Sequence, residues 1–145
     1  NDLPRRHPAF EALRKILDRH VAAFARGVEF DLAGRKLVLD SMWINILEKN
    51  GVHAPHIHPH SVLSGACYVQ TPKDSGDIRF EDPRLGLMMA APARRKSAKL
   101  ENRLFVSLAP RNGDVLLWES WLRHGVEMQE ARQNRISISF NYRLN

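Results

Sequence analysis

The run Arg135-Ile136-Ser137-Ile138-Ser139-Phe140-Asn141-Tyr142 alternates between polar and apolar side chains without a break. Successive side chains of an extended strand leave opposite faces, so this run predicts a β-strand with one wholly polar and one wholly apolar face. The apolar face predicts a hydrophobic core on one side of the strand. The polar face has two explanations: exposure to solvent or, in a barrel, the lining of a wet functional interior.

Short strand-like segments, separated by turn residues, precede this run. They are residues 35–39, 42–47, 61–71, 77–80, 104–108, 115–118 and 125–128, with a tight turn at Asn112-Gly113. Ahead of them, apolar residues from Phe10 to Phe24 recur at helical spacing and predict a helix that ends near Gly27 in a left-handed cap. We therefore expect a mostly β protein, a double-stranded β-helix (jelly-roll or cupin-like barrel) over 35–145 with an N-terminal packing helix within 1–27.

The composition, 43% hydrophobic and 26% charged, is typical of one soluble globular domain, here residues 1–145. No apolar run approaches the roughly 20 residues that span a bilayer, and no signal-peptide pattern opens the chain. Cys67 is the only cysteine, which excludes an internal disulfide and a thiolate metal cage and favours a cytoplasmic location. Because the sequence begins at Asn1 rather than at a methionine, we expect residues upstream of it.

The formal net charge is +6, and its local maximum is Arg94-Arg95-Lys96, followed by Lys99. No aromatic residues interleave with this cluster as platforms for base stacking, so a solvated basic loop is favoured over a nucleic-acid site. The surrounding stretch, residues 85–103, is irregular and contains Met88 and Met89. It is long enough for a lid or substrate wall, and a disordered surface loop is the alternative.

Four of the seven histidines lie in the run His53-Ala54-Pro55-His56-Ile57-His58-Pro59-His60. On an extended strand His56 and His58 leave the same face about 6–7 Å apart, so both imidazoles can turn onto one metal ion. The first and last histidines of the run are expected to be exposed neighbours. His124 is the only histidine C-terminal to the run and is the candidate third ligand. Three protein ligands suit Fe(II) and leave positions for substrate, water or oxygen.

The guanidinium of Arg135 offers a fixed cation for a small carboxylate beside such a metal. A surface salt bridge is the simpler alternative for the same residue. Taken with the histidines, the first interpretation predicts an iron enzyme with an acidic cosubstrate.

The order of these motifs resembles a family of 2-oxoglutarate- and Fe(II)-dependent oxygenases, mostly bacterial. That family shows His-x-His-Pro followed by Ser-Gly-x-x-Tyr, a Gly-Asp turn, a Trp-x-x-His-x-Val segment and a closing Arg-x-Ser-x-x-Phe-Asn. The matching elements lie in order within residues 43–143 and are His56–Pro59, Ser64–Tyr68, Phe80–Arg84, Gly113-Asp114, Trp121–Val126 and Arg135–Asn141.

The resemblance implies that His56, His58 and His124 are the catalytic metal ligands. Fe(II), 2-oxoglutarate and O2 are the implied cofactor and cosubstrates. The implied reaction converts 2-oxoglutarate to succinate and carbon dioxide and hydroxylates a C–H bond of an unidentified substrate, either a small molecule or a protein side chain.

By the same resemblance, Arg135 binds the distal carboxylate of 2-oxoglutarate, and Tyr68 falls where related hydroxylases place a tyrosine on that carboxylate. A core aromatic is the alternative for Tyr68. Ser137 and Ser139 are further cosubstrate candidates because they share the polar face of the last strand. Of the three tryptophans, Trp121 is expected nearest the pocket mouth.

One departure from the wider superfamily is the histidine at position 58, where most members carry Asp or Glu. A neutral imidazole leaves the metal one charge unit more positive, and Asp82, Asp114 or a water remain candidates to complete the shell. Three-histidine sites also occur in dioxygenases without 2-oxoglutarate. The alternatives are therefore a cupin-like metalloenzyme that does not use this cosubstrate, or a non-catalytic barrel that binds an acidic partner. Because the barrel is expected to have exposed edge strands, a homodimer is a further possibility.

Overall fold

The computed structural model describes residues 2–145, and Asn1, at the start of the predicted helical segment, lies outside the described residues. The elements in chain order are α1 (Leu3–Arg6), α2 (Pro8–Gly27), β1 (Leu37–Leu47), β2 (His53–His56), β3 (Leu63–Gln70), β4 (Ile78–Glu81), the short 3-10 helices η1 (Leu85–Leu87) and η2 (Leu100–Asn102), β5 (Phe105–Leu108), β6 (Val115–Glu119), β7 (His124–Val126) and β8 (Arg135–Leu144).

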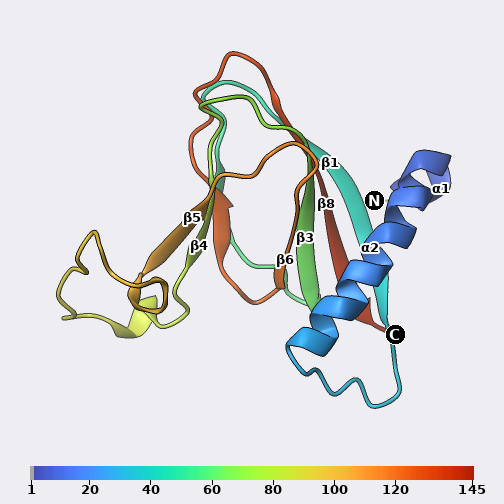
Figure 1. Cartoon of the computed structure of the whole chain (residues 1–145), viewed down its shortest axis with the longest axis horizontal. Coiled ribbons are helices and arrows are strands. Elements are labelled where there is room, and N and C mark those ends of the chain that lie inside the picture. Colours follow the sequence, from blue (N-terminus) through green and yellow to red (C-terminus); the bar gives the residue numbers. More distant parts are fainter. Residues whose placement is uncertain (1) are drawn as a thin grey trace.

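The strands form two antiparallel sheets of four, in the orders β1-β8-β3-β6 and β2-β7-β4-β5. Apart from the hairpin β4–β5, consecutive strands alternate between the two sheets, which is the connectivity of a double-stranded β-helix. Helix α2 lies along the outer face of the first sheet (Figure 1). The predicted mostly β barrel with an N-terminal helix is confirmed.

The larger hydrophobic core lies between α2 and the outer face of the first sheet, not between the sheets. Its fully buried members are Leu17, Val21, Met42, Leu63, Phe140 and Tyr142. The Tyr142 hydroxyl also donates to Asp18 Oδ1 of α2 (2.7 Å). The apolar face of β8 is thus covered by the helix, because the alternation of β8 turns Phe140 and Tyr142 outward and its polar side chains inward.

The polar face of β8 lies inside the barrel, so the solvent-facing explanation of its alternation is wrong. Arg135 and Ser137 are each 2% exposed, and both line a cavity between the sheets. A smaller inner core of Ala66, Tyr68, Ile78 and Trp118 packs beside this cavity. The fold therefore places its largest apolar cluster outside the first sheet and keeps the interior for polar side chains.

Two local predictions need correction. The segments predicted as 35–39 and 42–47 form one strand, β1, with a register shift between Leu39 and Ser41. Gly27 is the last residue of α2 and has no left-handed conformation; the positive φ after the helix is at Glu29 (57°). The turn at Asn112-Gly113 is present, with Gly113 at φ 88°.

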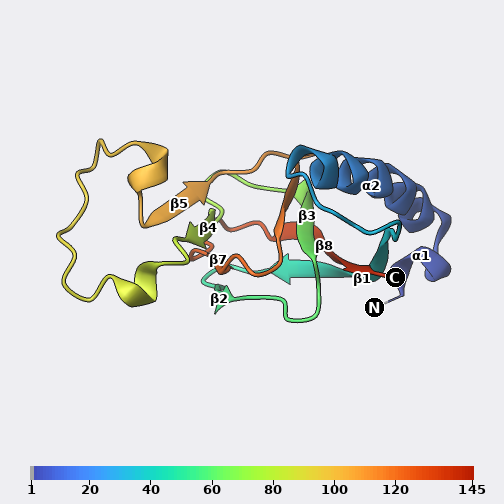
Figure 2. The same cartoon turned by 90° about the horizontal axis from the view of Figure 1, so that it is seen from below.

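Residues 85–103, called the arm from here on, project away from the barrel at the opposite end of the molecule from α2 (Figure 2). The arm contains η1 and η2 and joins β4 to β5. None of the helices described for residues 2–145 is long and apolar enough to cross a membrane.

Candidate metal centre

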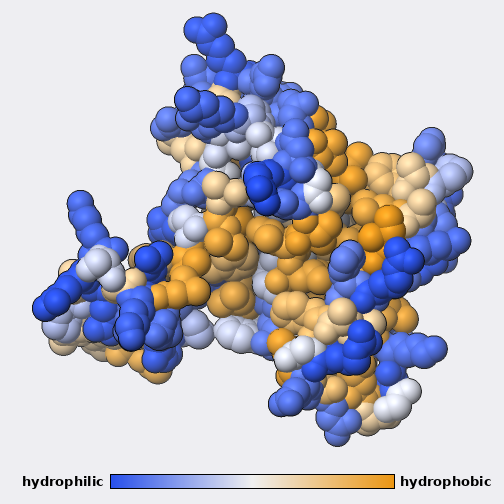
Figure 3. Space-filling view, in the orientation of Figure 1, coloured by the Kyte–Doolittle hydropathy of each residue, from blue (hydrophilic) through white to orange (hydrophobic). Residues whose placement is uncertain are grey.

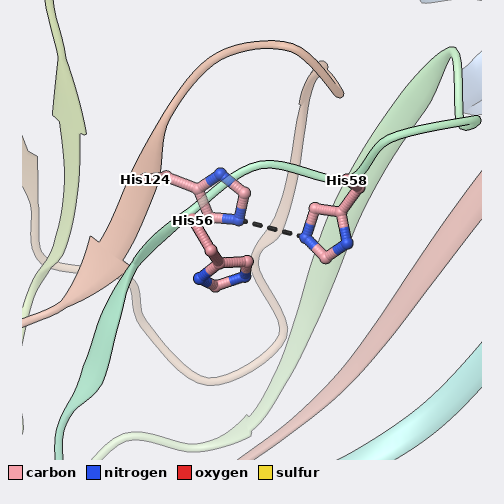
Figure 4. Close-up of side chains that lie close together, drawn as sticks. All are labelled: His56, His58 and His124. Atoms are coloured by element: carbon pink, nitrogen blue, oxygen red, sulfur yellow. Dashed lines mark hydrogen bonds between the residues drawn. The ribbon is translucent and has the colours of Figure 1, made fainter.

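Three imidazoles that line the cavity lie close together (Figure 4). One ligand nitrogen from each of His56, His58 and His124 lies within 4.8 Å of the other two. His56 ends β2 and is paired with His124, the first residue of β7, across the second sheet. His58 follows β2 instead of lying on it, so the prediction that one extended strand presents both histidines is wrong. The His58 N–H donates to the Ser120 carbonyl (3.1 Å), which holds the loop against the first sheet.

Backbone carbonyls set the tautomers of two rings. His56 Nδ1 donates to the Ala54 carbonyl and His124 Nδ1 to the Leu122 carbonyl, both at 2.8 Å. A carbonyl only accepts, so Nδ1 carries the proton of each neutral ring and Nε2 keeps a free lone pair. His124 Nε2 lies 3.3 Å from His58 Nε2. Hydrogen bonds of this kind from the second ring nitrogen are how proteins orient histidine ligands.

A buried polar chain reaches the third ring. His58 Nδ1 lies 3.4 Å from the Asn141 side-chain amide, whose other end bonds Ser64 Oγ (2.8 Å). Ser64 Oγ in turn bonds Ser120 Oγ (2.7 Å), and both serines are fully buried. A 180° rotation of the amide exchanges its oxygen and nitrogen. With the oxygen toward His58, Nδ1 donates and all three rings present Nε2 to one point.

Two of the imidazoles, those of His58 and His124, are biased toward the neutral form that metal ligation requires. Burial lowers the pKa of His124 to about 4, and the neighbouring His56 and His58 lower it further, against the Leu122 hydrogen bond. Burial, then His56, also lowers the pKa of His58. Near neutral pH these two rings are therefore lone-pair donors and not cations.

The cavity beside the cluster has a volume of about 390 Å³, and three of the residues that line it each carry a buried polar atom without a hydrogen-bond partner in the described chain. These atoms are Tyr68 Oη, Trp118 Nε1 and Arg135 Nε. Buried polar groups are nearly always paired, so unpaired donors on a cavity wall indicate a polar ligand. The residues thus fit both a metal ion at the histidines and an oxygen-rich molecule beside it.

Arg135 is the most unusual of the three. Its side chain is buried and takes part in no ion pair within residues 2–145, so the surface salt bridge considered for it is wrong. Its guanidinium carbon lies 5.0 Å from the centre of the Tyr68 ring. Burial lowers the pKa of Arg135, partly offset by Tyr68 and Asp77, and burial raises the pKa of Tyr68. Tyr68 belongs both to the inner core and to the cavity wall.

The other predicted cosubstrate residues also line the cavity. Ser137 is buried, and Ser139 Oγ accepts a hydrogen bond from Asn45 Nδ2 (2.7 Å). Asn45 Oδ1 accepts from Trp43 Nε1 (3.1 Å). Neither Trp43 nor Asn45 was singled out from the sequence. The signal was available, because Asn45 is a polar residue between Ile44 and Ile46 on a strand that pairs with β8.

Several other residues considered for the site lie elsewhere than expected. Trp121 is 53% exposed and does not line the cavity, whereas Trp118 does, so the tryptophan at the site was wrongly chosen. His53 is half-buried on the cavity wall, not a simple exposed neighbour, while His60 is exposed. Asp82 bonds Arg84, and neither it nor Asp114 belongs to the ligand cluster.

Comparison with known proteins gives a family and a fold. A family model described as "Putative 2OG-Fe(II) oxygenase" matches residues 41–141. No curated protein sequence matches this chain.

Several solved structures share the fold at low sequence identity. HygX from Streptomyces hygroscopicus, with nickel and 2-oxoglutarate bound, is 20% identical with a TM-score of 0.64, over 97% of this chain and 69% of that one. A second HygX structure also holds hygromycin B. A prolyl-4-hydroxylase from Pseudomonas putida is 14% identical with a TM-score of 0.62, over 93% and 65%.

An oxidoreductase of the 2OG-Fe(II) oxygenase family from Burkholderia pseudomallei is 18% identical with a TM-score of 0.59, over 76% of this chain. This chain spans 46% of the length of that protein and about two thirds of the other two. The likeness to these structures is one of fold, and the family match covers more than half of the chain. The protein belongs to the 2OG-Fe(II) oxygenase family represented by that model.

Proposed function

We propose that this protein is a non-haem Fe(II) dioxygenase that couples decarboxylation of 2-oxoglutarate to hydroxylation of a substrate not yet identified. The observation that carries the proposal is Arg135, a buried side chain with no anionic partner within residues 2–145 on the wall of the cavity that the three histidines also line. A buried cation costs free energy unless an anion neutralises it. A dicarboxylate that also reaches the metal supplies that anion.

In this proposal His56, His58 and His124 hold the iron through Nε2. The bound iron, with O2 and 2-oxoglutarate, would supply the oxidising chemistry, and the protein supplies position and electrostatics. Arg135 donates to the distal carboxylate, with the Tyr68 hydroxyl as a second donor, because both are buried and have unused donor capacity. Ser137 adds a hydroxyl on the same wall.

The charge of the site favours a dianion. The described ligand cluster contains three imidazoles and no carboxylate, so no negatively charged ligand offsets the two positive charges of Fe(II). Arg135 adds a third positive charge nearby. A 2-oxoglutarate dianion reduces this sum to one, whereas a neutral ligand would leave it unchanged. The histidine at position 58 therefore strengthens the case for an anionic cosubstrate.

The main alternative is a three-histidine metalloenzyme that does not use 2-oxoglutarate. It accounts for the histidines equally well, but it gives no anion to Arg135, whose charge has no ion-pair partner within residues 2–145. The second alternative is a non-catalytic barrel that binds an acidic partner, which needs no reaction at the histidines. It leaves unexplained why carbonyls and a buried polar chain orient the three rings.

Stepwise titration under anaerobic conditions tests the proposal. The metal-stripped protein is titrated with Fe(II) and then with 2-oxoglutarate, and we expect a weak visible charge-transfer band only when both are present. Arg143→Met is the matched control for Arg135→Met, because Arg143 lies on the same strand but is exposed and paired with Asp40. A band that is absent from the native protein, or unchanged in Arg135→Met, contradicts the proposal.

The setting belongs to the same proposal. A bacterial cytoplasm suits a chain with one cysteine, and burial raises the pKa of the Cys67 thiol, which makes it a poor nucleophile. The substrate is a small molecule or a protein side chain, and a homodimer would cover the exposed sheet edges. Lid behaviour of the arm over the cavity is likewise a proposal.

A further inference from the structure

The arm carries most of the net charge of the protein. Residues 85–103 contain five cations, Arg94, Arg95, Lys96, Lys99 and Arg103, and one carboxylate, Glu101. Four of the six net positive charges of the whole chain therefore lie in this segment. The arm contains no aromatic residue, so it offers no platform on which nucleic-acid bases could stack.

The cations of the arm have no ion-pair partner within residues 2–145. All five are exposed. Elsewhere Arg84 pairs with Asp82, Arg123 with Glu81 and Arg143 with Asp40, whereas the exposed Arg19, Arg35 and Arg132 have no ion pair within residues 2–145. The arm differs from these isolated cations because it gathers five within one segment. The arm is thus a surface whose positive charge is not neutralised from within the described chain.

The same segment exposes apolar side chains. Met89 is 96%, Leu87 85% and Leu100 60% exposed, the three highest values among the large hydrophobic residues of the described chain. Figure 3 shows the projection as a mainly hydrophilic surface interrupted by apolar patches. Basic and apolar groups displayed side by side are the complement of a ligand with acidic and apolar groups.

The base of the arm adjoins the candidate metal centre. Phe80 of β4 is paired with His124, and the next residue, Glu81, donates its N–H to the Arg123 carbonyl. The arm begins four residues after Glu81, and its hydrogen bonds run within 82–104, with none to the rest of the barrel. The arm is therefore joined to the barrel at the strand that pairs with His124.

We propose that the arm binds an acidic polypeptide segment whose hydroxylated residue enters the cavity. This inference rests on the proposed function, and it names the substrate class. A cavity of about 390 Å³ with 2-oxoglutarate bound would leave room for little more than one side chain, and no residue of the arm lines it, so a ligand that uses both must extend beyond the cavity. An extended chain with Asp or Glu and apolar residues does, and it matches both kinds of side chain on the arm.

The test measures binding of peptide pools to the Fe(II)- and 2-oxoglutarate-loaded protein under anaerobic conditions. Three fluorescent pools of equal length are compared: Asp/Glu with Leu/Val, Gln/Asn with Leu/Val, and Lys/Arg with Leu/Val. We expect the acidic pool to bind most tightly and its affinity to fall with rising salt. In the arm variant Arg94→Glu, Arg95→Glu, Lys96→Glu its affinity should fall about tenfold to a hundredfold, as lost pairs and new repulsions add up.

The matched control reverses the charge of three exposed basic residues in other loops. It carries Lys49→Glu, Lys73→Glu and Arg132→Glu, which change the net charge equally and lie outside the cavity wall. This control should keep the affinity of the native protein. Met89→Ser, which leaves the charge untouched, should weaken the acidic pool by a smaller factor.

The outcomes separate this inference from the proposed function. Equal affinity for the acidic and neutral pools, or equal loss in the arm variant and the control, overturns the inference while the charge-transfer band still supports the oxygenase. Arm-dependent binding of the acidic pool without that band supports the arm and contradicts the oxygenase. Arm-dependent binding to vesicles of anionic phospholipid, with no preference among peptide pools, also overturns the inference in favour of a membrane surface.

Discussion

Replacing Arg135 by methionine should affect stability and cosubstrate binding in opposite directions. The guanidinium is buried and has no anionic partner in residues 2–145, so it costs free energy in the ligand-free fold. Methionine fills much of the same volume without that cost. The change therefore removes a penalty from the empty protein and a binding partner from the loaded one.

Both magnitudes follow from the environment of Arg135. A hydrogen bond between charged groups contributes about 1.5–3 kcal/mol, so losing a two-pronged contact costs about 3 kcal/mol or more, roughly a hundredfold in the Kd of 2-oxoglutarate. Removing an unpaired buried charge should stabilise the ligand-free fold by about 1–2 kcal/mol, a rise of roughly 2–8 °C in Tm for a chain of this size.

Thermal melts of the metal-stripped protein and calorimetric titration of the Fe(II) form with 2-oxoglutarate measure the two effects. Arg143→Met, an exposed arginine of the same strand, should leave the Kd unchanged and the Tm nearly so. A lower Tm in Arg135→Met together with an unchanged Kd would refute the reasoning. It would mean that the guanidinium is satisfied within the fold and not reserved for a ligand.

Three further substitutions test neighbouring parts of the site. Tyr68→Phe removes a buried, unpaired hydroxyl, so 2-oxoglutarate should bind about tenfold more weakly in calorimetry while the Tm stays level or rises. Asn141→Leu removes the partner of His58 Nδ1 and should weaken Co(II) or Fe(II) about tenfold to a hundredfold in competition with a chelator; unchanged metal affinity contradicts the orienting role. Gly65→Val places a side chain against the Phe140 ring, and it should destabilise the fold by about 3 kcal/mol in denaturant unfolding, with a normal Tm counting against the close contact.

Much of the fold was predictable because it is encoded locally. The alternation of residues 135–142 assigns each side chain of β8 to one of two faces, and helical spacing marks α2. Local rules failed where tertiary packing overrides them. Two predicted strands merge into β1 because β8 supplies a continuous partner, and α2 continues through Gly27 before the backbone turns at Glu29.

The candidate site was predictable in its residue types but not in its geometry. His56, His58 and His124 could be named from spacing and from a resemblance to a family. The reason they meet is long-range: β2 pairs with β7, and the Ser120 carbonyl holds the loop that carries His58. The sequence analysis favoured Trp121 for the site, whereas it is Trp118 that lines the cavity. Trp118 of β6 is paired with Ser64 of β3, and this pairing places its side chain on the inner face of the first sheet.

The sequence by itself determined that this chain is a barrel whose last strand alternates polar and apolar side chains. It also supplied the candidate metal ligands and Arg135 in the order expected of the family. Periodicity and side-chain chemistry are local properties, so the sequence contains them. Only the tertiary structure decided that the polar face of β8 points inward. It also decided that Arg135 has no anionic partner in the described chain, and that β4, the strand that leads into the arm, pairs with His124. The physical reason is that burial and pairing depend on which distant segments pack together, and no window of sequence contains that information.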